Sequence, residues 1–316
     1  MKRRSFVAGL GLAASLPPTP GQSQQPGRQY KLGYLSLAPV RADVAEELAK
    51  AGFVDGKNLS VIDAKAIDIG LPAAAAKLVA ADVDVMFAGG DGAALAAQQA
   101  TRTIPIVAIA DNLLGLVSSL ARPTGNLTGV NIFANELNGK RQELLIELVP
   151  GMKRLAIFAD PGTASAEEVE VLRKEAQGRG IDVRAWQIRS AAEIGPAIEA
   201  ARAWGAEGLN ALASPLFHSV HKEFIDRVNA ARLPTIFQWP EYVQEGALIT
   251  YGPRLETIYR TLITPRLIKF LRGAKVADVP AEQPTNFELG LNLRTARALG
   301  ITVPTTMLAR ADEVIE

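Results

Sequence analysis

The sequence predicts an α/β protein of two lobes, each built on a doubly wound, mostly parallel sheet, with a ligand cleft between them. Short apolar runs that suit buried strands alternate with helical segments from Tyr30 onward, which is typical of parallel sheets. The alternation completes one cycle near residue 130 and begins a second near residue 138. With 316 residues, 48% of them hydrophobic, the chain is long enough to fill two cores.

One strand–helix–strand unit lies between Val83 and Asp111. An apolar run ends at the glycine turn GGDG, an alanine-rich segment favours a helix, and a second apolar run follows Pro105. Ligands bind beyond the carboxyl ends of parallel strands. The unit therefore places four residues at a binding edge: Gly90, Asp91, Gly92 and Asp111.

The same alternation extends on both sides of this unit. In the first cycle, strands are predicted at 34–37, 59–63 and 127–130, and helices at 40–51 and 71–81. The second cycle opens with an amphipathic helix at 138–149, and Ser165 and Glu168 have the spacing of a capping box. Its other elements are strands at 154–159, 181–188, 208–213 and 233–237, and helices at 191–204 and 219–231.

The C-terminal third has a different pattern and is expected to cross back between the lobes. A strand between glycines (246–252) precedes a helix (257–272) with Pro265 near its middle. An extended segment follows at 279–284, then a strand at 287–292 and a helix at 295–299.

Residues 1–28 are predicted to be an export signal and a polar leader. Lys2, Arg3 and Arg4 precede an apolar segment (6–16), and a Pro/Gln/Gly-rich stretch follows. The apolar segment is too short for a permanent transmembrane helix, and RRSFV resembles the twin-arginine export pattern. We therefore expect an exported, periplasmic protein. The alternative is that these first residues are a disordered tail of a cytosolic protein.

Charge and composition exclude several classes of function. Residues 1–28 hold four of the 34 basic residues and no acidic one, so the remaining chain has 30 basic and 33 acidic residues, a net charge of about −3. No Lys/Arg cluster remains to support nucleic-acid binding. The absence of cysteine excludes disulfides, thiol chemistry and Cys-ligated metal.

Four stretches carry a resemblance to a known family. They are GLVSSLARPTGNLTGV (115–130), NGKRQELLIELVPGMKRLAIF (138–158), ALITYG (247–252) and FLRGAKVADVPAEQPTNFELGLNLRTARALGITVPTTMLARADEVI (270–315). From about Lys31 to its end, the chain is similar to ABC-transporter substrate-binding proteins of the tryptophan/tyrosine type. Two departures are a shorter first loop and helix (36–45) and GGDGAA in place of the usual small-polar and proline loop.

The resemblance implies two lobes of the type I periplasmic binding-protein kind, joined by three crossovers and closing on a small solute. It places lobe 1 at 29–134 plus 253–284 and lobe 2 at 135–252 plus 285–316. It also implies delivery to the membrane subunits of an ABC permease. We expect a monomer that binds an amino acid or an aromatic or organic acid. The alternatives are a receptor for a membrane signalling partner and a phosphate-ligand enzyme that uses the GGDG loop.

The loops that follow the strands supply the candidate ligand contacts of the first lobe. Ser36 and Leu37 follow the first strand, where a hydroxyl and amides can hold a carboxylate; the alternative is a simple turn. Asp91 can pair with a ligand amine or cap the helix at 93–100, and Asp111 has the same two interpretations.

The second lobe supplies further candidates. Asp160 and Thr163 precede a helix start, which suits an anion or plain capping. An aromatic wall would suit a flat or apolar solute; the alternatives are a core position for Trp239 and hinge packing for Tyr251. The remaining candidates are Ser214, Phe217, Gln238, Trp239, Tyr242 and Tyr251.

Catalytic motifs give little support to an enzyme. GGDG resembles a phosphate loop of NAD and lipid kinases, but neither a G-x-S-x-G elbow nor a P-loop occurs. The two histidines, His218 and His221, share a helix at a spacing that suits a metal or, as we expect, a solvated face. We predict no catalytic residue, metal or cofactor.

Overall fold

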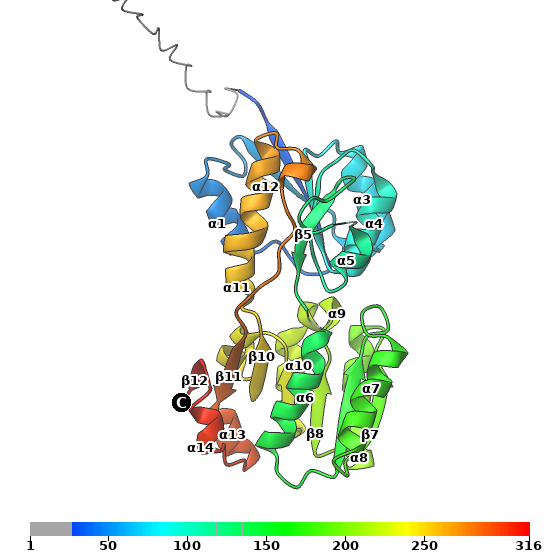
Figure 1. Cartoon of the computed structure of the whole chain (residues 1–316), viewed down its shortest axis with the longest axis vertical. Helices are drawn as coiled ribbons and strands as arrows, with labels where there is room; N and C mark the ends of the chain where they lie inside the picture. The colour runs from blue at the N-terminus through cyan, green and yellow to red at the C-terminus, as the bar shows by residue number, and fades with distance from the viewer. Residues whose placement is uncertain (1–26, 118, 134) are drawn as a thin grey trace, which may run out of the picture.

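The computed structural model describes residues 27–117, 119–133 and 135–316, and it has two lobes arranged end to end (Figure 1). Each lobe is a sheet with helices on both faces, which confirms the predicted α/β class with two parallel-sheet lobes. Most of the predicted export signal lies outside the described residues. In the described part of the chain, no helix is long and apolar enough to cross a membrane.

The first lobe is built on a five-stranded parallel sheet with the order β2-β1-β3-β4-β5. Along β1, Leu32 and Tyr34 pack in one core with Leu48 of α1, whereas Leu35 packs in the core on the opposite face with Leu78 of α3. The strands are β1 (Tyr30–Leu35), β2 (Leu59–Asp63), β3 (Val85–Gly89), β4 (Ile106–Ala110) and β5 (Leu127–Asn131). The helices are α1 (Ala42–Lys50), α2 (Ala66–Ile69), α3 (Leu71–Ala80), α4 (Asp91–Ala100) and α5 (Leu113–Leu116).

The second lobe has a seven-stranded sheet with the order β12-β11-β10-β9-β8-β6-β7, in which only β10 and β11 are antiparallel neighbours. The strands are β6 (Arg154–Ala159), β7 (Asp182–Gln187), β8 (Gly208–Ala211), β9 (Thr235–Phe237), β10 (Ile249–Gly252), β11 (Glu288–Asn292) and β12 (Glu313–Ile315). The helices are α6 (Glu136–Leu148), α7 (Ala166–Gln177), η1 (Ala191–Glu193), α8 (Ile194–Trp204), α9 (Pro215–Ser219), α10 (His221–Ala230), η2 (Pro240–Glu245), α13 (Leu293–Leu299) and α14 (Thr305–Leu308).

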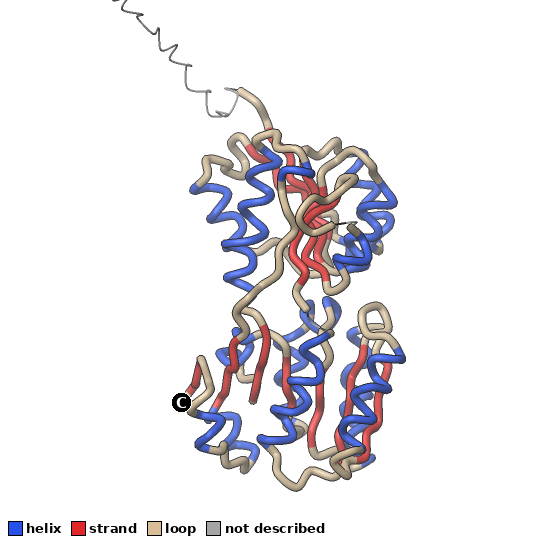
Figure 2. The backbone as a smooth tube through the Cα atoms, viewed as in Figure 1, coloured by secondary structure: helices blue, strands red, loops and turns tan. Residues whose placement is uncertain are grey.

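The chain passes between the lobes three times, after β5, after β10 and before β11 (Figure 2). After β10 it returns to the first lobe as one helical stretch of α11 (Leu255–Thr257), the π-helical turn η3 (Ile258–Ile263) and α12 (Thr264–Leu271); η4 (Val276–Asp278) follows. The π turn lies directly before Pro265, which lacks the N–H for a regular helical hydrogen bond. We propose lobe boundaries at 134/135, 252/253 and 284/285, within these three connections.

The helix predicted at 219–231 is confirmed as α10, and the second lobe adds elements that were not predicted, among them the short helices α9 and α14 and the strand β12. The Ser165 hydroxyl caps α7 by accepting from the Glu168 amide at 3.1 Å, and the Glu168 carboxylate interacts in return with the Ser165 amide, as the predicted capping box requires. The same carboxylate also accepts from Asn138 at 2.6 Å.

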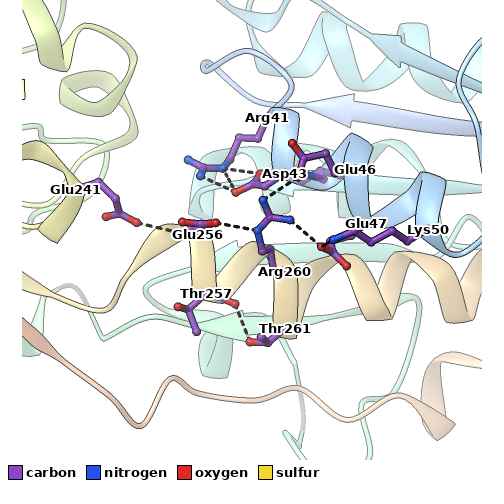
Figure 3. Close-up of polar contacts among 11 residues, drawn as sticks. Arg41, Asp43, Glu46, Glu47, Lys50, Glu241, Glu256, Thr257, Arg260 and Thr261 are labelled. Atoms are coloured by element: carbon purple, nitrogen blue, oxygen red, sulfur yellow. Dashed lines mark hydrogen bonds and ion pairs between the residues drawn. The ribbon is translucent and has the colours of Figure 1, made fainter. Parts of the chain in front are cut away.

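Arg260 joins the helical stretch 255–271, which we call the return helix, to α1 (Figure 3). Its guanidinium pairs with Glu46 and Glu47 of α1 at 2.8 and 2.7 Å and with Glu256 at 2.9 Å. The carboxylate of Glu241, in the second lobe, accepts from the Glu256 amide at 3.0 Å. Exposed ion pairs contribute little singly, but this group connects the start of the return helix to both lobes.

Gly129 offers a test of the close packing between β4 and β5. A Cβ at this position would lie 1.9 Å from the Ala108 carbonyl oxygen, and backbone atoms cannot rotate away as a side chain can. We expect Gly129→Ala to lower the free energy of unfolding by about 2 kcal/mol or more, measured by urea denaturation. The control is Gly139→Ala in α6, where a Cβ would make only ordinary contacts and should be neutral or slightly stabilising. Equal stability of both variants would contradict such a close approach of the two strands.

Candidate ligand-binding site between the lobes

A cavity lies where the carboxyl ends of the strands of the two lobes face each other. Its empty space, with the open solvent at its mouth included, measures about 530 Å³, and about 60 Å³ of it is accessible to the centres of water-sized molecules. The first lobe contributes loops after β1, β3 and β4, the second lobe loops after β8 and β9, and the return helix one further wall. The lining residues are Ser36, Ala38, Gly89, Gly90, Ile109, Ala110, Asp111, Ile132, Ser214, Pro215, His218, Gln238, Trp239, Leu255 and Tyr259.

The two lobes touch beside this cavity, at Gly90 and Pro215. A Cβ on Gly90 would lie 2.7 Å from Pro215 Cγ, and the φ of Gly90 is +98°, a conformation that favours glycine. The Gly90 amide donates to the Ile109 carbonyl at 2.8 Å. In the GGDG turn, the Gly90 amide is therefore bonded within the first lobe, and Gly90 itself packs against the second lobe. This arrangement does not suit a loop whose free amides hold a phosphate.

The cavity walls are mostly apolar and partly aromatic. Ile109, Ile132 and Leu255 supply aliphatic surface, and Trp239 and Tyr259 supply rings. The Tyr259 ring lies under the Arg41 guanidinium at 4.7 Å, and burial raises the pKa of its phenol to about 12. Such walls suit a flat or apolar part of a solute.

Two polar side chains at the wall have unused hydrogen-bonding capacity. Trp239 is 5% exposed and Gln238 is 8% exposed. Within the described residues, neither Trp239 Nε1 nor Gln238 Oε1 has a hydrogen-bond partner. A buried polar group without a partner costs roughly 1–3 kcal/mol, and of the described atoms of this kind these two are the ones that belong to cavity-lining residues.

Ser214 lines the cavity, but its hydroxyl is fully used within the second lobe. It donates to Asp160 Oδ2 at 2.6 Å and accepts from the amides of Leu216 and Phe217 as the cap of α9. Asp160 Oδ1 accepts from the Gly162 amide at 2.8 Å, and the Thr163 hydroxyl donates to the Ala213 carbonyl at 3.0 Å. These predicted contacts therefore hold the loops that shape the cavity.

Asp91 has a role that neither sequence interpretation included. Its carboxylate accepts from the backbone amides of Asp111 and Asn112, at 3.1 and 2.8 Å, and so ties the end of β4 to the start of α4. The interpretation of Asp91 as a helix cap is wrong, because α4 is preceded by Gly90 and Asp91 bonds to another loop. Asp91 and Gly92 line a neighbouring groove and not the cavity, whereas Asp111 lines both the cavity and the groove.

His218 is the main correction to the sequence analysis, which expected a solvated helix face. The ring lines the cavity, and its Nδ1 lies 2.5 Å from the Tyr242 hydroxyl. Burial, with a smaller effect of His221, lowers the pKa of His218 to about 3. His221 stacks on Tyr242 at 4.5 Å and pairs with Glu245 at 3.1 Å. Among the described residues no group of three side chains suits a metal.

Helical geometry explains why His218 lines the cavity and Phe217, which was predicted to do so, does not. Pro215 and His218 are three residues apart in α9, so they share the face that borders the cavity. Phe217 points the other way and packs edge-on against Phe224 at 5.4 Å in the core. The Ser-Pro helix start after a strand, followed at this spacing by a histidine, is the signal that could have identified His218.

The structure brings part of the predicted set to the cavity. The predicted residues at the cavity are Ser36, Gly90, Asp111, Ser214, Gln238 and Trp239. Those outside its lining are Leu37, Asp91, Gly92, Asp160, Thr163, Phe217, Tyr242 and Tyr251. Among these, Leu37 packs on the first-lobe core, and the Tyr251 carbonyl accepts from Arg141. The lining residues that the prediction lacked include Ile109, Ile132, His218, Leu255 and Tyr259.

Comparison with known proteins identifies the family. Residues 35–315 match the family model described as ABC transporter substrate binding protein. The chain belongs to this family.

Relatives of this substrate-binding protein include a tyrosine-binding protein of Clostridioides difficile (strain R20291), 26% identical over 275 residues that cover 84% of this chain and 77% of the relative. A conserved domain protein from Vibrio cholerae has a TM-score of 0.78 at 25% identity, and a Streptococcus pneumonia domain in complex with L-Trp has 0.76 at 21%. Each covers 91% of this chain and 100% of the other chain. Type I periplasmic binding proteins share the two-lobe fold.

The lowered pKa of His218 predicts a specific pH dependence of stability. Between pH 6.5 and about 3 the unfolded chain binds a proton at this histidine that the folded protein does not, so stability is lost as the pH falls below 6.5. The loss is at most about 1.4 kcal/mol per pH unit. His218→Phe should therefore flatten the decline in unfolding free energy between pH 7 and 5, measured by urea denaturation.

His221→Phe is the matched control, because His221 is paired with Glu245 and belongs to the same stack. Removal of His218 also takes away a partner of Tyr242, which changes the stability at every pH but not its slope. Slopes that are equal in the wild type and His218→Phe would contradict a neutral, buried His218.

Proposed function

We propose that this protein is a periplasmic solute-binding protein that captures an aromatic amino acid by lobe closure and delivers it to an ABC importer. The observation that carries the proposal is the interlobe cavity, which is walled by aliphatic and aromatic side chains. Gln238 and Trp239 border it with buried polar atoms that have no partner in the described part of the chain. Sites of this kind bind flat ligands that present a few polar groups.

The charges at the cavity favour an amino acid over a simple aromatic acid. Asp111 is the one carboxylate among the lining residues, and no Lys or Arg is among them. A ligand amine near Asp111 gains favourable electrostatic energy. The tyrosine-binding relative and the L-Trp complex of a structural neighbour support the same ligand class.

Closure follows from the origin of the lining residues. Since they come from both lobes and the return helix, a solute that contacts all three binds the closed arrangement more tightly than an open one. One chain completes the cavity, which suits a monomeric receptor whose closed form the membrane subunits recognise. Export by the N-terminal signal places the receptor in the periplasm, and the proposal includes no catalytic step.

Trp239→Phe tests whether the indole N–H contributes to ligand binding. The variant removes the indole N–H, so we expect about tenfold weaker binding of L-tryptophan or L-tyrosine by isothermal titration calorimetry. Because Trp239 is buried in the core, loss of part of its ring should also lower the unfolding free energy of the ligand-free variant by about 1–3 kcal/mol, so urea denaturation first establishes that the variant is folded.

The matched control is Trp204→Phe, at the end of α8, where the indole packs on Trp186 and does not line the cavity. This control should bind the ligand as the wild type does. Binding of neither aromatic amino acid to the wild type would overturn the proposed ligand class. Unchanged affinity in Trp239→Phe would overturn the assignment of Trp239.

A further inference from the structure

His218 occupies a fixed place at the second-lobe wall of the cavity. It lies on α9, whose start is held because Ser214 caps it and donates to Asp160. The His218 ring lies beside the Trp239 ring, with centroids 6.3 Å apart and planes at 67°. Both side chains therefore border the same part of the cavity.

The hydrogen bond to Tyr242 decides which ring nitrogen of His218 carries the proton. Tyr242 is buried, and burial raises the pKa of its phenol well above the usual value, so the hydroxyl keeps its proton. His218 Nδ1 is the acceptor available to that proton among the described residues, at 2.5 Å. If Nδ1 were protonated instead, the buried hydroxyl would be left without an acceptor, which is unfavourable. The proton of the neutral imidazole therefore lies on Nε2.

The opposite sides of the cavity then differ in the ligand groups that they accept. The first lobe presents Asp111, a carboxylate that attracts an amine and repels another carboxylate. The second lobe contributes Trp239 and His218 to the lining, and their N–H groups are at Trp239 Nε1, which is buried without a partner among the described residues, and at His218 Nε2. Neutral donors can satisfy a carboxylate group without a cationic side chain.

We propose that His218 and Trp239 form a pair of neutral N–H donors that binds the carboxylate of the ligand, with Tyr242 as the positioning residue that holds the His218 tautomer. This inference rests on the proposed function and assigns an orientation to the ligand: the carboxylate lies against the second lobe and the amine toward Asp111. Tyr242 acts only through His218, because it lies outside the lining of the cavity.

Three probes test the orientation on the full mature chain: L-tryptophan, tryptamine, which lacks the carboxylate, and indole-3-propionate, which lacks the amine. His218→Phe keeps an aromatic ring but removes the donor. It should weaken L-tryptophan and indole-3-propionate at least tenfold and tryptamine less than threefold. Asp111→Asn should weaken L-tryptophan and tryptamine and spare indole-3-propionate.

Two variants separate a donor role from mere packing. His218→Gln, whose amide N–H can replace Nε2–H, should recover part of the affinity that His218→Phe loses. His221→Phe, in the neighbouring ring of the same stack, should bind all three probes within threefold of the wild type. Unfolding measurements on each variant establish that it is folded.

The ring proton itself is observed by long-range ¹H–¹⁵N NMR spectra of the histidines in the ligand-free protein. We expect the Nε2–H tautomer of His218 from pH 8 to 5, and a mixture of tautomers in Tyr242→Phe. An Nδ1–H tautomer or a charged ring at pH 6 in the wild type would overturn the inference, as would full L-tryptophan affinity in His218→Phe. If none of the three probes binds the wild type, the proposed function fails instead; these two failures are therefore distinct.

Discussion

The buried guanidinium of Arg141 is the constraint on which the arrangement of the second lobe at the hinge depends. Arg141 is fully buried in α6, and burial lowers the pKa of its guanidinium to about 10. Its Nη1 donates to the Tyr251 carbonyl at 3.1 Å and its Nη2 to Asn138 Oδ1 at 2.6 Å. A buried charge is tolerated only where hydrogen bonds satisfy it. Helix α6, which follows the first crossing, is thus bound to the end of β10, where the second crossing begins.

A similar logic distinguishes structural from ligand-binding polar groups around the cavity. The carboxylates of Asp91 and Asp160 each lie near a strand end, and each reaches across to the loop of another strand. They hold the cavity-lining segments at Asp111 and Ser214, and their hydrogen-bonding capacity is used within a lobe. Gln238 and Trp239 lie at equivalent strand ends but have atoms without a protein partner among the described residues. Other described residues, among them Asn210, Thr250 and Thr264, also have buried atoms without a partner, so it is the combination of such an atom with a place at the cavity wall that identifies the groups left for a solute.

Much of this arrangement could be predicted from the sequence because its signals are local. Apolar runs bounded by glycine and proline mark the strands, and Gln238 and Trp239 directly follow one of them, so their place at the cavity could be predicted. Asp91 could not be assigned, because its partners lie twenty and more residues away on the next strand end. Phe217 and His218 are neighbours in α9, and the direction in which each side chain leaves the helix places His218 at the cavity and Phe217 in the core. Tyr259 reaches the cavity through the return helix, a tertiary placement that no local pattern contains.

The same atoms that indicate a ligand also determine how closure responds to it. In the closed arrangement without a ligand, Trp239 Nε1 and Gln238 Oε1 are removed from water and have no partner in the described chain, an unfavourable contribution of roughly 1–3 kcal/mol for each. We expect that opening the lobes gives these atoms access to water and removes that contribution. A ligand that bonds to them removes it in the closed state instead, so its binding energy is realised mainly there. Because a ligand shifts a conformational equilibrium only by its differential affinity for the two states, unpartnered groups at the interlobe wall make closure depend on the solute.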